Sequence, residues 1–183
     1  TDLIAIARTD AEAATLITSN IDPRDHAYIL GSTNPKLQPL NDIMISAENA
    51  GKKGAELEAI EESWKSQARL KCFSDAVVET IANSGSMNKK ELAAQFLGEI
   101  KGKSNTEARA IAKGITGIDI FWDWDSPRTR EGYYRLHGGC ECAINRAVAY
   151  GPYADVLWME SKFPDIAQAE QFAFGVHAKF PAQ

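Results

Sequence analysis

The chain has 183 residues, of which 44% are hydrophobic and 25% are charged, with a formal net charge of −5 at pH 7. This length leaves room for one domain with its own core, and the composition is that of an ordinary globular protein. The mild negative charge argues against nucleic acid as a partner. No apolar run approaches the roughly 18 residues that a membrane-spanning helix needs. Three cysteines are too few for a disulfide framework, which favours a reducing compartment.

Residues 3–8 form a short apolar run that ends in the charged Arg8. Such a run is typical of a strand buried on both faces. Thr9 and Glu12 have the spacing of a capping box, so we predict that a short helix follows over residues 11–18. Because the sequence starts without Met and enters a strand almost at once, we expect it to be an excerpt from a longer polypeptide.

Helical periodicity dominates residues 32–117. Apolar residues recur every three or four positions over 57–68, 73–81, 88–96 and 106–113, and this pattern predicts amphipathic helices. Strand-like runs are absent from the block, which we therefore expect to be all helical.

The last third of the chain returns to strands and helices. The pattern predicts an extended segment at 118–122, a helix at 140–150, and a second buried strand at 154–160 that ends in Glu160. Pro164 stands where we expect the first residue of a final helix.

Continuous apolar strands followed by helices indicate a parallel sheet covered on both faces, and therefore an α/β fold. The commonest fold of this kind is the (β/α)8 TIM-type barrel, but a complete barrel needs about 250 residues. We therefore predict part of a barrel with a large all-helical insertion. Residues 1–31 would supply a strand and its helix, residues 32–117 the insertion, and residues 118–183 a helix, the next strand and a final helix.

Binding and catalytic groups of such a barrel lie where its strands end, so Arg8 and Glu160 are the candidate site residues. Arg8 could grip a carboxylate through two parallel N–H bonds beside the N–H groups of a helix start. The alternative for Arg8 is a structural ion pair, for example with Asp10. For Glu160, four roles stay open: a carboxylate near a metal, an acid–base group, the ion-pair partner of Arg8, or a carboxylate at a helix start.

Other motif-like segments carry weaker signals. Residues 98–104 imitate a phosphate-binding P-loop, but three residues separate the glycines where the motif has four, and no strand precedes them. We predict a turn between helices there. Cys140 and Cys142 resemble part of a zinc cluster, yet residues two apart on a helix point to different sides. In the stretch 128–135 we expect structural ion pairs with acidic neighbours, namely Asp123, Asp125 and Glu131.

Four stretches resemble the isocitrate lyase family. Residues 6–19 (IARTDAEAATLITS) look like its fifth-strand motif, and residues 128–135 (RTREGYYR) and 154–161 (ADVLWMES) fit the family downstream. Residues 101–113 (KGKSNTEARAIAK) are similar to part of the insertion in its fungal members. The resemblance covers essentially the whole chain and implies that the two strands are the fifth and sixth of the barrel.

The resemblance implies a carbon–carbon lyase of the glyoxylate cycle, which splits isocitrate into glyoxylate and succinate by a retro-aldol reaction. It implies Mg²⁺, with Mn²⁺ as a substitute, because metal and cationic donors must stabilise the enediolate-like charge that develops. Arg8 matches the family arginine that binds a substrate carboxylate. Glu160 matches an active-site carboxylate near substrate and metal, behind the direct ligands of the metal. A homotetramer in the glyoxysome, peroxisome or cytoplasm is also implied.

The family's catalytic cysteine lies in a Lys-Lys-Cys-Gly-His stretch that this chain lacks, and its main metal-binding aspartate lies further upstream. The resemblance therefore assigns no catalytic residue and no direct metal ligand to this segment, and the segment alone is expected to be inactive. One alternative is the paralogue 2-methylisocitrate lyase, which yields pyruvate and succinate and would place the protein in the mitochondrion. An alternative of another class is a non-catalytic helical interaction or oligomerisation module formed by residues 32–117.

Overall fold

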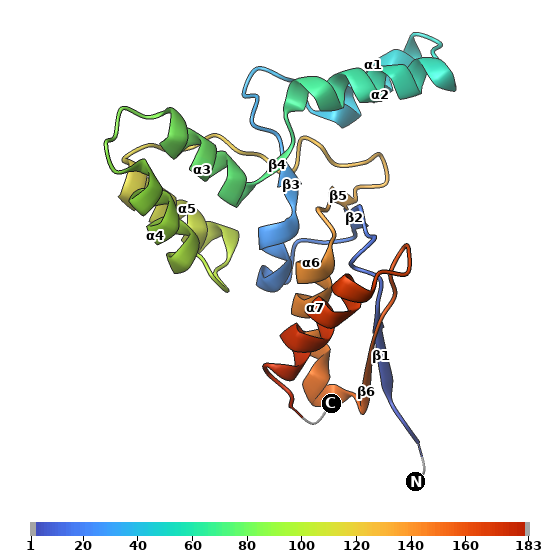
Figure 1. Cartoon of the computed structure of the whole chain (residues 1–183). Helices are drawn as coiled ribbons and strands as arrows, with labels where there is room; N and C mark the ends of the chain where they lie inside the picture. Colours follow the sequence, from blue (N-terminus) through green and yellow to red (C-terminus); the bar gives the residue numbers. More distant parts are fainter. Residues whose placement is uncertain (1–2, 182–183) are drawn as a thin grey trace. The chain divides into compact units, whose positions relative to one another are not determined.

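The computed structural model describes residues 3–181, so the first and last two residues of the predicted ranges lie outside the described part. The fold is α/β, with helices predominating (Figure 1). The chain divides into two compact units. The terminal unit consists of Thr1–Thr15 and Leu136–Gln183, and the central unit of Leu16–Arg135.

The terminal unit is built on two parallel strands, β1 (Ile6–Thr9) and β6 (Val156–Met159). Parallel pairing of the two apolar runs is what the sequence predicts. Their register places Arg8 opposite Trp158. The carboxyl ends of β1 and β6 therefore meet at the same edge, where Arg8 and Glu160 are found.

Two helices complete this unit. Helix α6 (Cys140–Tyr150), which agrees with the predicted helix, contacts both strands, and α7 (Ile166–His177) packs along α6 (Figure 1). The short 3-10 helix η2 (Gly151–Tyr153) leads from α6 to β6. Small residues of α6, Ala143 and Ala147, are fully buried, which allows the helix to lie close to its neighbours.

Side chains of the two strands alternate between an exposed and a more buried face, as the period of two in a strand requires. Ile6, Val156 and Trp158 are 58%, 45% and 52% exposed. Thr9, on the opposite face of β1, is buried. The face that carries Arg8 is therefore open.

The predicted helix over residues 11–18 is wrong. The chain instead makes a turn and enters the short strand β2 (Leu16–Ile17). Backbone carbonyl groups of this segment are bonded instead to a distant part of the chain. The Ala11 carbonyl accepts from Gly139 N–H at 3.2 Å, and the Thr15 carbonyl accepts from Leu136 N–H at 2.8 Å.

The predicted capping box at Thr9 and Glu12 is wrong for the same kind of reason. Thr9 Oγ1 accepts the N–H of Ala11 at 3.2 Å and so closes a turn. The Glu12 carboxylate bonds instead to Lys162 and Gln168. The Glu12 carboxylate therefore bonds to residues far away in the sequence rather than to the N–H of Thr9, as a capping box requires.

The start of the last helix also differs from the prediction. Pro164 precedes α7, which begins at Ile166 with Asp165 as its N-cap. The Asp165 carboxylate accepts the N–H of Gln168 at 3.2 Å. An aspartate side chain can satisfy a free helix N–H, which a proline cannot, so the helix begins after Asp165.

The strands of the central unit form two short antiparallel pairs. β2 pairs with β5 (Tyr134–Arg135), and β3 (Leu30–Gly31) pairs with β4 (Lys71–Cys72). Because β4 lies inside the block 32–117, the prediction that this block is all helical is wrong at that point. The 3-10 helix η1 (Pro23–Tyr28) precedes β3.

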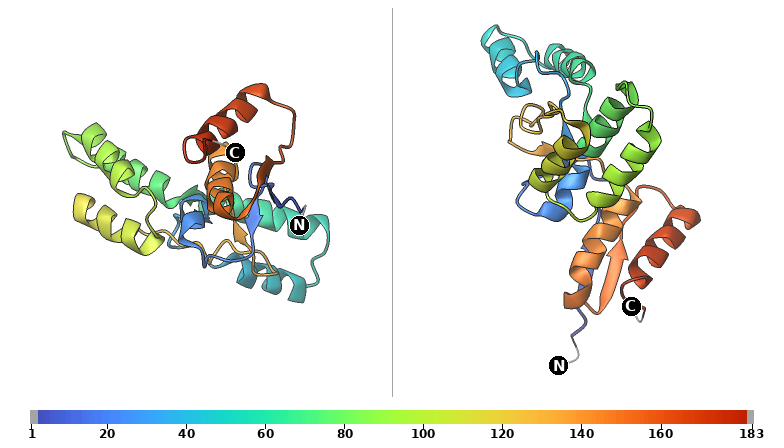
Figure 2. Two further views of the ribbon diagram at one scale, coloured as in Figure 1. Left: turned by 90° about the horizontal axis from the view of Figure 1, so that it is seen from below. Right: turned by 90° about the vertical axis from the view of Figure 1, so that its left-hand side faces the viewer.

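Five helices of the central unit fall into two groups (Figures 1 and 2). The first group is the pair α1 (Leu40–Asn49) and α2 (Ala55–Ala68), and the second consists of α3 (Phe73–Asn83), α4 (Lys89–Glu99) and α5 (Asn105–Thr116). The helices α2 to α5 confirm the four that periodicity predicts. Each of these helices buries at least one residue of the apolar set that predicted it, such as Trp64 in α2 and Phe96 in α4.

Trp122 anchors the segment after α5. It is 2% exposed, and its indole N–H donates to the Lys71 carbonyl at 2.8 Å. The rings of Phe73 and Trp124 meet it edge-on at 5.6 Å and 5.5 Å, and the Arg109 guanidinium lies 5.6 Å from its centre. Residues 118–122 lie outside any strand, and of these residues Trp122 is the one that is buried.

Helix α5 begins with a complete capping box. Ser104 Oγ accepts the N–H of Glu107, and the Glu107 carboxylate accepts the N–H of Ser104 at 2.9 Å. The backbone N–H and hydroxyl of Ser104, with Lys103, lower the pKa of Glu107 to about 2. Residues 100–104 thus form a turn between α4 and α5, as predicted, whereas Gly98 and Glu99 still belong to α4.

Because the folded pKa of Glu107 lies below its ordinary value of 4.5, its contribution to stability is present above about pH 4.5 and is lost as the pH falls toward 2. We expect Ser104→Ala to raise the pKa of Glu107 part of the way toward 4.5, because the hydroxyl donor is lost while the backbone N–H of residue 104 remains. Titration of the Glu107 side-chain carboxyl by NMR, with and without the substitution, measures this shift. An unchanged pKa would contradict the capping box.

Among residues 3–181, no helix combines the length and the apolar character needed to cross a bilayer.

Candidate functional site

The two candidate residues meet at the carboxyl ends of β1 and β6. Arg8 Nη1 lies 2.9 Å from Glu160 Oε2. The backbone brings them together, because the N–H of Glu160 donates to the Thr9 carbonyl at 2.9 Å and extends the strand pairing by one residue. Of the alternatives that the sequence left open, ion pairing between Arg8 and Glu160 is confirmed, and Asp10 is not the residue that pairs with Arg8 here.

Trp158 is a third member of this group that the sequence argument did not identify. It lies opposite Arg8 in the register, and the Arg8 Cζ atom is 5.9 Å from the centre of its ring. A guanidinium at this distance from an indole is attracted to the negative face of the ring. The signal was present in the sequence, since Trp158 and Glu160 are two residues apart and share a face of the strand.

The ion pair leaves both side chains accessible. The Arg8 and Glu160 side chains are 54% and 49% exposed. An exposed pair of this kind contributes at most about 1 kcal/mol to stability. The guanidinium has five N–H donors, so a half-exposed Arg8 that bonds Glu160 through Nη1 can still offer donors to an anion from solvent.

The described residues do not by themselves make a metal site. Within residues 3–181, no three His, Cys, Asp or Glu side chains cluster as metal ligands would. Glu160 already engages Arg8. A carboxylate with a cationic partner can stand near a metal but is one ligand at most, so the residues present do not fit a complete divalent-cation centre.

The cysteines of α6 are buried. Burial, with the charges of Glu141 and Glu12, raises the pKa of the Cys140 thiol, whose Sγ lies 3.6 Å from the Gln168 carbonyl oxygen. Cys140 therefore stays a neutral thiol that packs between α6 and α7. Cys142 is also buried.

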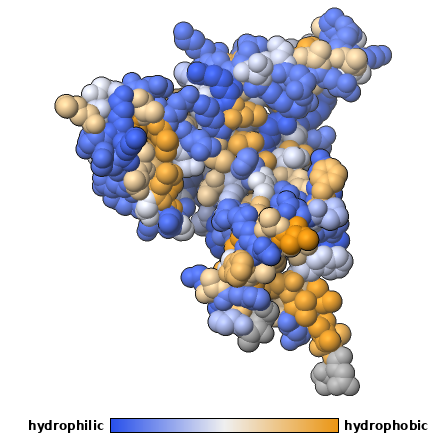
Figure 3. All heavy atoms as spheres, in the orientation of Figure 1, coloured by the Kyte–Doolittle hydropathy of each residue, from blue (hydrophilic) through white to orange (hydrophobic). Residues whose placement is uncertain are grey.

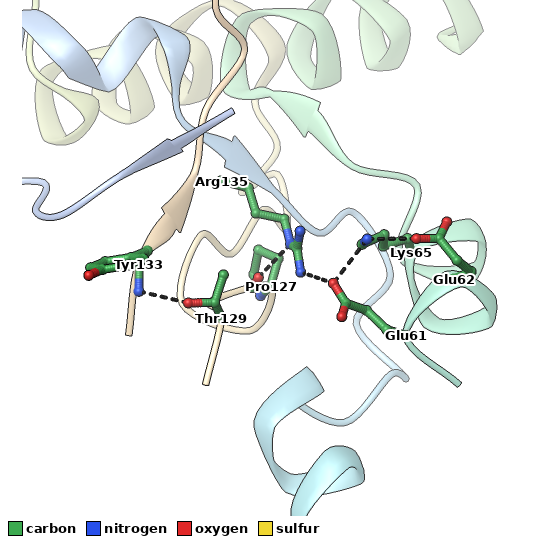
Figure 4. Close-up of polar contacts among 7 residues, drawn as sticks. All are labelled: Glu61, Glu62, Lys65, Pro127, Thr129, Tyr133 and Arg135. Carbon is green, nitrogen blue, oxygen red and sulfur yellow. Dashed lines mark hydrogen bonds and ion pairs between the residues drawn. The ribbon is translucent and has the colours of Figure 1, made fainter. Parts of the chain in front are cut away.

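The arginine-rich stretch forms ion pairs in the central unit (Figure 4). Arg135 Nη2 lies 2.6 Å from Glu61 Oε1, which also pairs with Lys65 at 2.9 Å. Burial opposes the charge on Glu61, but hydrogen bonds from Lys65 and Arg135 outweigh it and lower the pKa of the carboxyl. Arg128 pairs with Asp125 at 3.5 Å, as expected.

Two details of that stretch differ from the expectation. Arg135 and Arg130 pair with Glu61 and Glu48, acids from α2 and α1, rather than with the neighbouring acids that the sequence suggested. The sequence shows only which acidic residues are near in the chain. The fold places α1 and α2 beside residues 128–135, so acidic residues of these helices become the partners. These arginines hold the loop in place.

A cavity of about 500 Å³ lies in the central unit, beside α3 and residues 118–121. Arg8 and Glu160, which belong to the terminal unit, do not line it. The Arg8–Glu160 pair stays the candidate site, because it lies at strand ends, where α/β enzymes bind their ligands.

The sequence is similar to one protein family and to several of its characterised members over essentially its whole length. A family model described as "Isocitrate lyase family" matches residues 1–183. The chain is 50% identical to isocitrate lyase of Saccharomyces cerevisiae and 43% identical to isocitrate lyase of Pinus taeda, with 100% and 98% of the chain covered. It is 38% identical to the mitochondrial 2-methylisocitrate lyase of Hypocrea atroviridis, over 98% of its length. The chain spans about a third of each relative: 33%, 33% and 32%.

Proposed function

Because the chain belongs to the isocitrate lyase family, we propose that the full-length protein cleaves isocitrate to glyoxylate and succinate, and that Arg8 and Glu160 form part of its substrate site. The observation that carries the site is the half-exposed Arg8–Glu160 pair at the ends of two parallel strands. The preference for isocitrate over 2-methylisocitrate rests on the higher identity to isocitrate lyases, 50% against 38%.

The proposed reaction is a retro-aldol cleavage. The substrate hydroxyl loses its proton, its oxygen becomes the aldehyde of glyoxylate, and the breaking carbon–carbon bond leaves its electron pair on the succinate fragment. That fragment is an enediolate-like anion until it takes up a proton. A fixed cation can bind a substrate carboxylate that is charged throughout the reaction, and so hold the substrate in place for the cleavage.

Arg8 is suited to binding such a carboxylate. A guanidinium offers two parallel N–H groups that match the two oxygens of a carboxylate. Glu160 and Trp158 hold the guanidinium from two sides, through a 2.9 Å ion pair and a 5.9 Å ring contact. Both contacts reduce the freedom that Arg8 would lose on binding substrate.

We further propose that β1 and β6 are the fifth and sixth strands of a (β/α)8 barrel. The supporting observation is the open face of the strand pair, opposite to the side on which α6 packs. Large apolar side chains lie exposed there and at the start of β1, where hydrophobic residues gather on the surface (Figure 3). In a barrel this face would be the filled interior.

The proposal includes Mg²⁺, for which Mn²⁺ could substitute, as a Lewis acid that polarises substrate oxygens. The residues of this chain do not fit a complete site for it, so its ligands would have to come from other segments of the full-length protein. A homotetramer in the glyoxysome, peroxisome or cytoplasm completes the proposal for the full-length protein.

Steady-state turnover of isocitrate and of 2-methylisocitrate by the full-length protein with Mg²⁺ tests the proposal. We expect kcat/KM to be at least about 10-fold higher for isocitrate, because one methyl group in a fitted pocket is worth about 1–3 kcal/mol. The isolated 183-residue chain, which we expect to be inactive, is the control. Preference for 2-methylisocitrate would assign the protein to the paralogue, and turnover of neither substrate would refute the proposal.

A further inference from the structure

Glu12 lies in the turn after β1, where its carboxylate bonds to the segment that follows β6. Its Oε2 atom accepts the backbone N–H of Lys162 at 3.0 Å. Its Oε1 atom accepts a side-chain N–H of Gln168, in the first turn of α7, also at 3.0 Å. Both carboxylate oxygens are therefore used, and they hold two different parts of the chain.

These bonds fix the loop on which Glu160 stands. The N–H of Glu160 donates to the Thr9 carbonyl, and two residues later the N–H of Lys162 donates to Glu12. The segment 160–162 is thus tied at both ends to the turn that follows Arg8. A shift of that loop would move the Glu160 carboxylate away from the Arg8 guanidinium, with which it makes a 2.9 Å ion pair.

The second bond ties the same turn to α7. Gln168 donates its backbone N–H to Asp165, the N-cap, and its side-chain N–H to Glu12. The end of the loop is therefore held by the helix cap, and the capped helix is in turn held by Glu12. The loop has little freedom to move while the carboxylate is in place.

We infer that Glu12 is a positioning residue, which holds Glu160 against Arg8 by fixing the loop between β6 and α7. This inference rests on the proposed function of the Arg8–Glu160 pair. Glutamine has the size of glutamate but offers one acceptor oxygen and an NH₂ group, so it can accept only one of the two bonds well. Its NH₂ group would face an N–H donor at the other position.

We expect Glu12→Gln in the full-length protein to lower kcat/KM for isocitrate by about 10- to 100-fold, the usual effect of removing a group that orients a binding residue. The loss should appear mainly as a higher KM, because Arg8 binds a carboxylate that is charged before and during the reaction. The matched control is Glu141→Gln. Glu141 also accepts a side-chain N–H from a glutamine of α7, Gln171, at 2.8 Å, but it lies on α6 and away from the loop. It should leave both constants unchanged.

A double-mutant cycle separates positioning from a general structural role. In a Glu160→Gln background, Glu12→Gln should change kcat/KM by less than about 3-fold, because the group that it positions is already altered. Independent, multiplying effects would overturn the inference. Gln168→Ala removes one of the two bonds and serves as the milder variant if Glu12→Gln folds poorly; we expect it to lower kcat/KM by about 3- to 10-fold.

Four variants distinguish a wrong role for Glu12 from a wrong assignment of the substrate site. If Arg8→Lys and Glu160→Gln lower turnover while Glu12→Gln and Gln168→Ala do not, only the positioning role is refuted. If Arg8→Lys and Glu160→Gln both leave turnover unchanged, the substrate site itself is refuted, and the role of Glu12 with it.

Discussion

Replacing Arg8 by lysine in the full-length protein should lower kcat/KM for isocitrate by about 100-fold or more while changing stability little. Lysine keeps the positive charge but loses the planar pair of N–H groups that matches a carboxylate. It also loses the favourable stacking of a guanidinium on Trp158. The stability change should stay below about 1 kcal/mol, because the ion pair with Glu160 is half exposed. Steady-state kinetics and thermal unfolding of the same preparation measure both quantities.

The matched control for this experiment is Arg24→Lys. Arg24 also pairs with a neighbouring carboxylate, that of Asp22, at 2.7 Å, and its side chain is 58% exposed. It lies in the central unit, so the substitution removes a similar surface pair without touching the strand ends. We expect normal turnover from it. Near-normal kinetics for Arg8→Lys would reduce Arg8 to a structural ion pair.

Replacing Gly138 by alanine should destabilise the terminal unit by about 2–3 kcal/mol and also lower turnover. A Cβ atom at this position would meet the carbonyl oxygens of Ala11 and Glu12 at 2.7 and 2.9 Å, and that of Ala14 more closely still. These are backbone atoms that no side-chain rotation can move aside, so the turn after β1 must shift. That turn carries Glu12 and lies just beyond the end of β1, which holds Arg8.

Gly98→Ala is the control for Gly138→Ala. Gly98 lies inside α4, and a Cβ atom there would meet no atom within 4 Å. We expect it to raise stability by about 0.5–1 kcal/mol, because alanine loses less backbone freedom than glycine in a helix. The midpoints of thermal unfolding of the two full-length variants measure the contrast. A Gly138→Ala protein as stable as the unsubstituted one would mean that the close approach to the turn is not required.

Much of the fold follows from local patterns. The two apolar runs predicted β1 and β6, because a short continuous apolar run is typical of a strand in a parallel sheet. The burial on both faces that such a run predicts is not observed, since Ile6, Val156 and Trp158 are exposed. The helices α2 to α6 followed from apolar residues spaced for one helical face. Each of these signals lies within a short window, and no distant residue was needed to find it.

The wrong predictions fall where backbone and side-chain groups form hydrogen bonds with residues far away in the sequence instead of with near neighbours. The sequence IARTDAEAATLITS has the apolar spacing and the capping residues of a strand and a helix, yet residues 11–18 form no helix. The N–H groups of Gly139 and Leu136 bond to the Ala11 and Thr15 carbonyls, and Lys162 and Gln168 bond to the Glu12 carboxylate. None of these four partners lies within the four residues over which helical hydrogen bonds act.

The sequence by itself determined the candidates for the site, because a charged residue that ends a buried apolar strand is recognisable from its neighbours alone. The tertiary structure decided how they are arranged. Arg8 and Glu160 pair, and Trp158 lies opposite Arg8, only because β1 and β6 align in parallel and in one register. Glu12 acquires its partners only because the turn after β1 meets the loop after β6. Local propensity acts over a few residues, whereas a pair of side chains from two strands depends on the packing that aligns those strands.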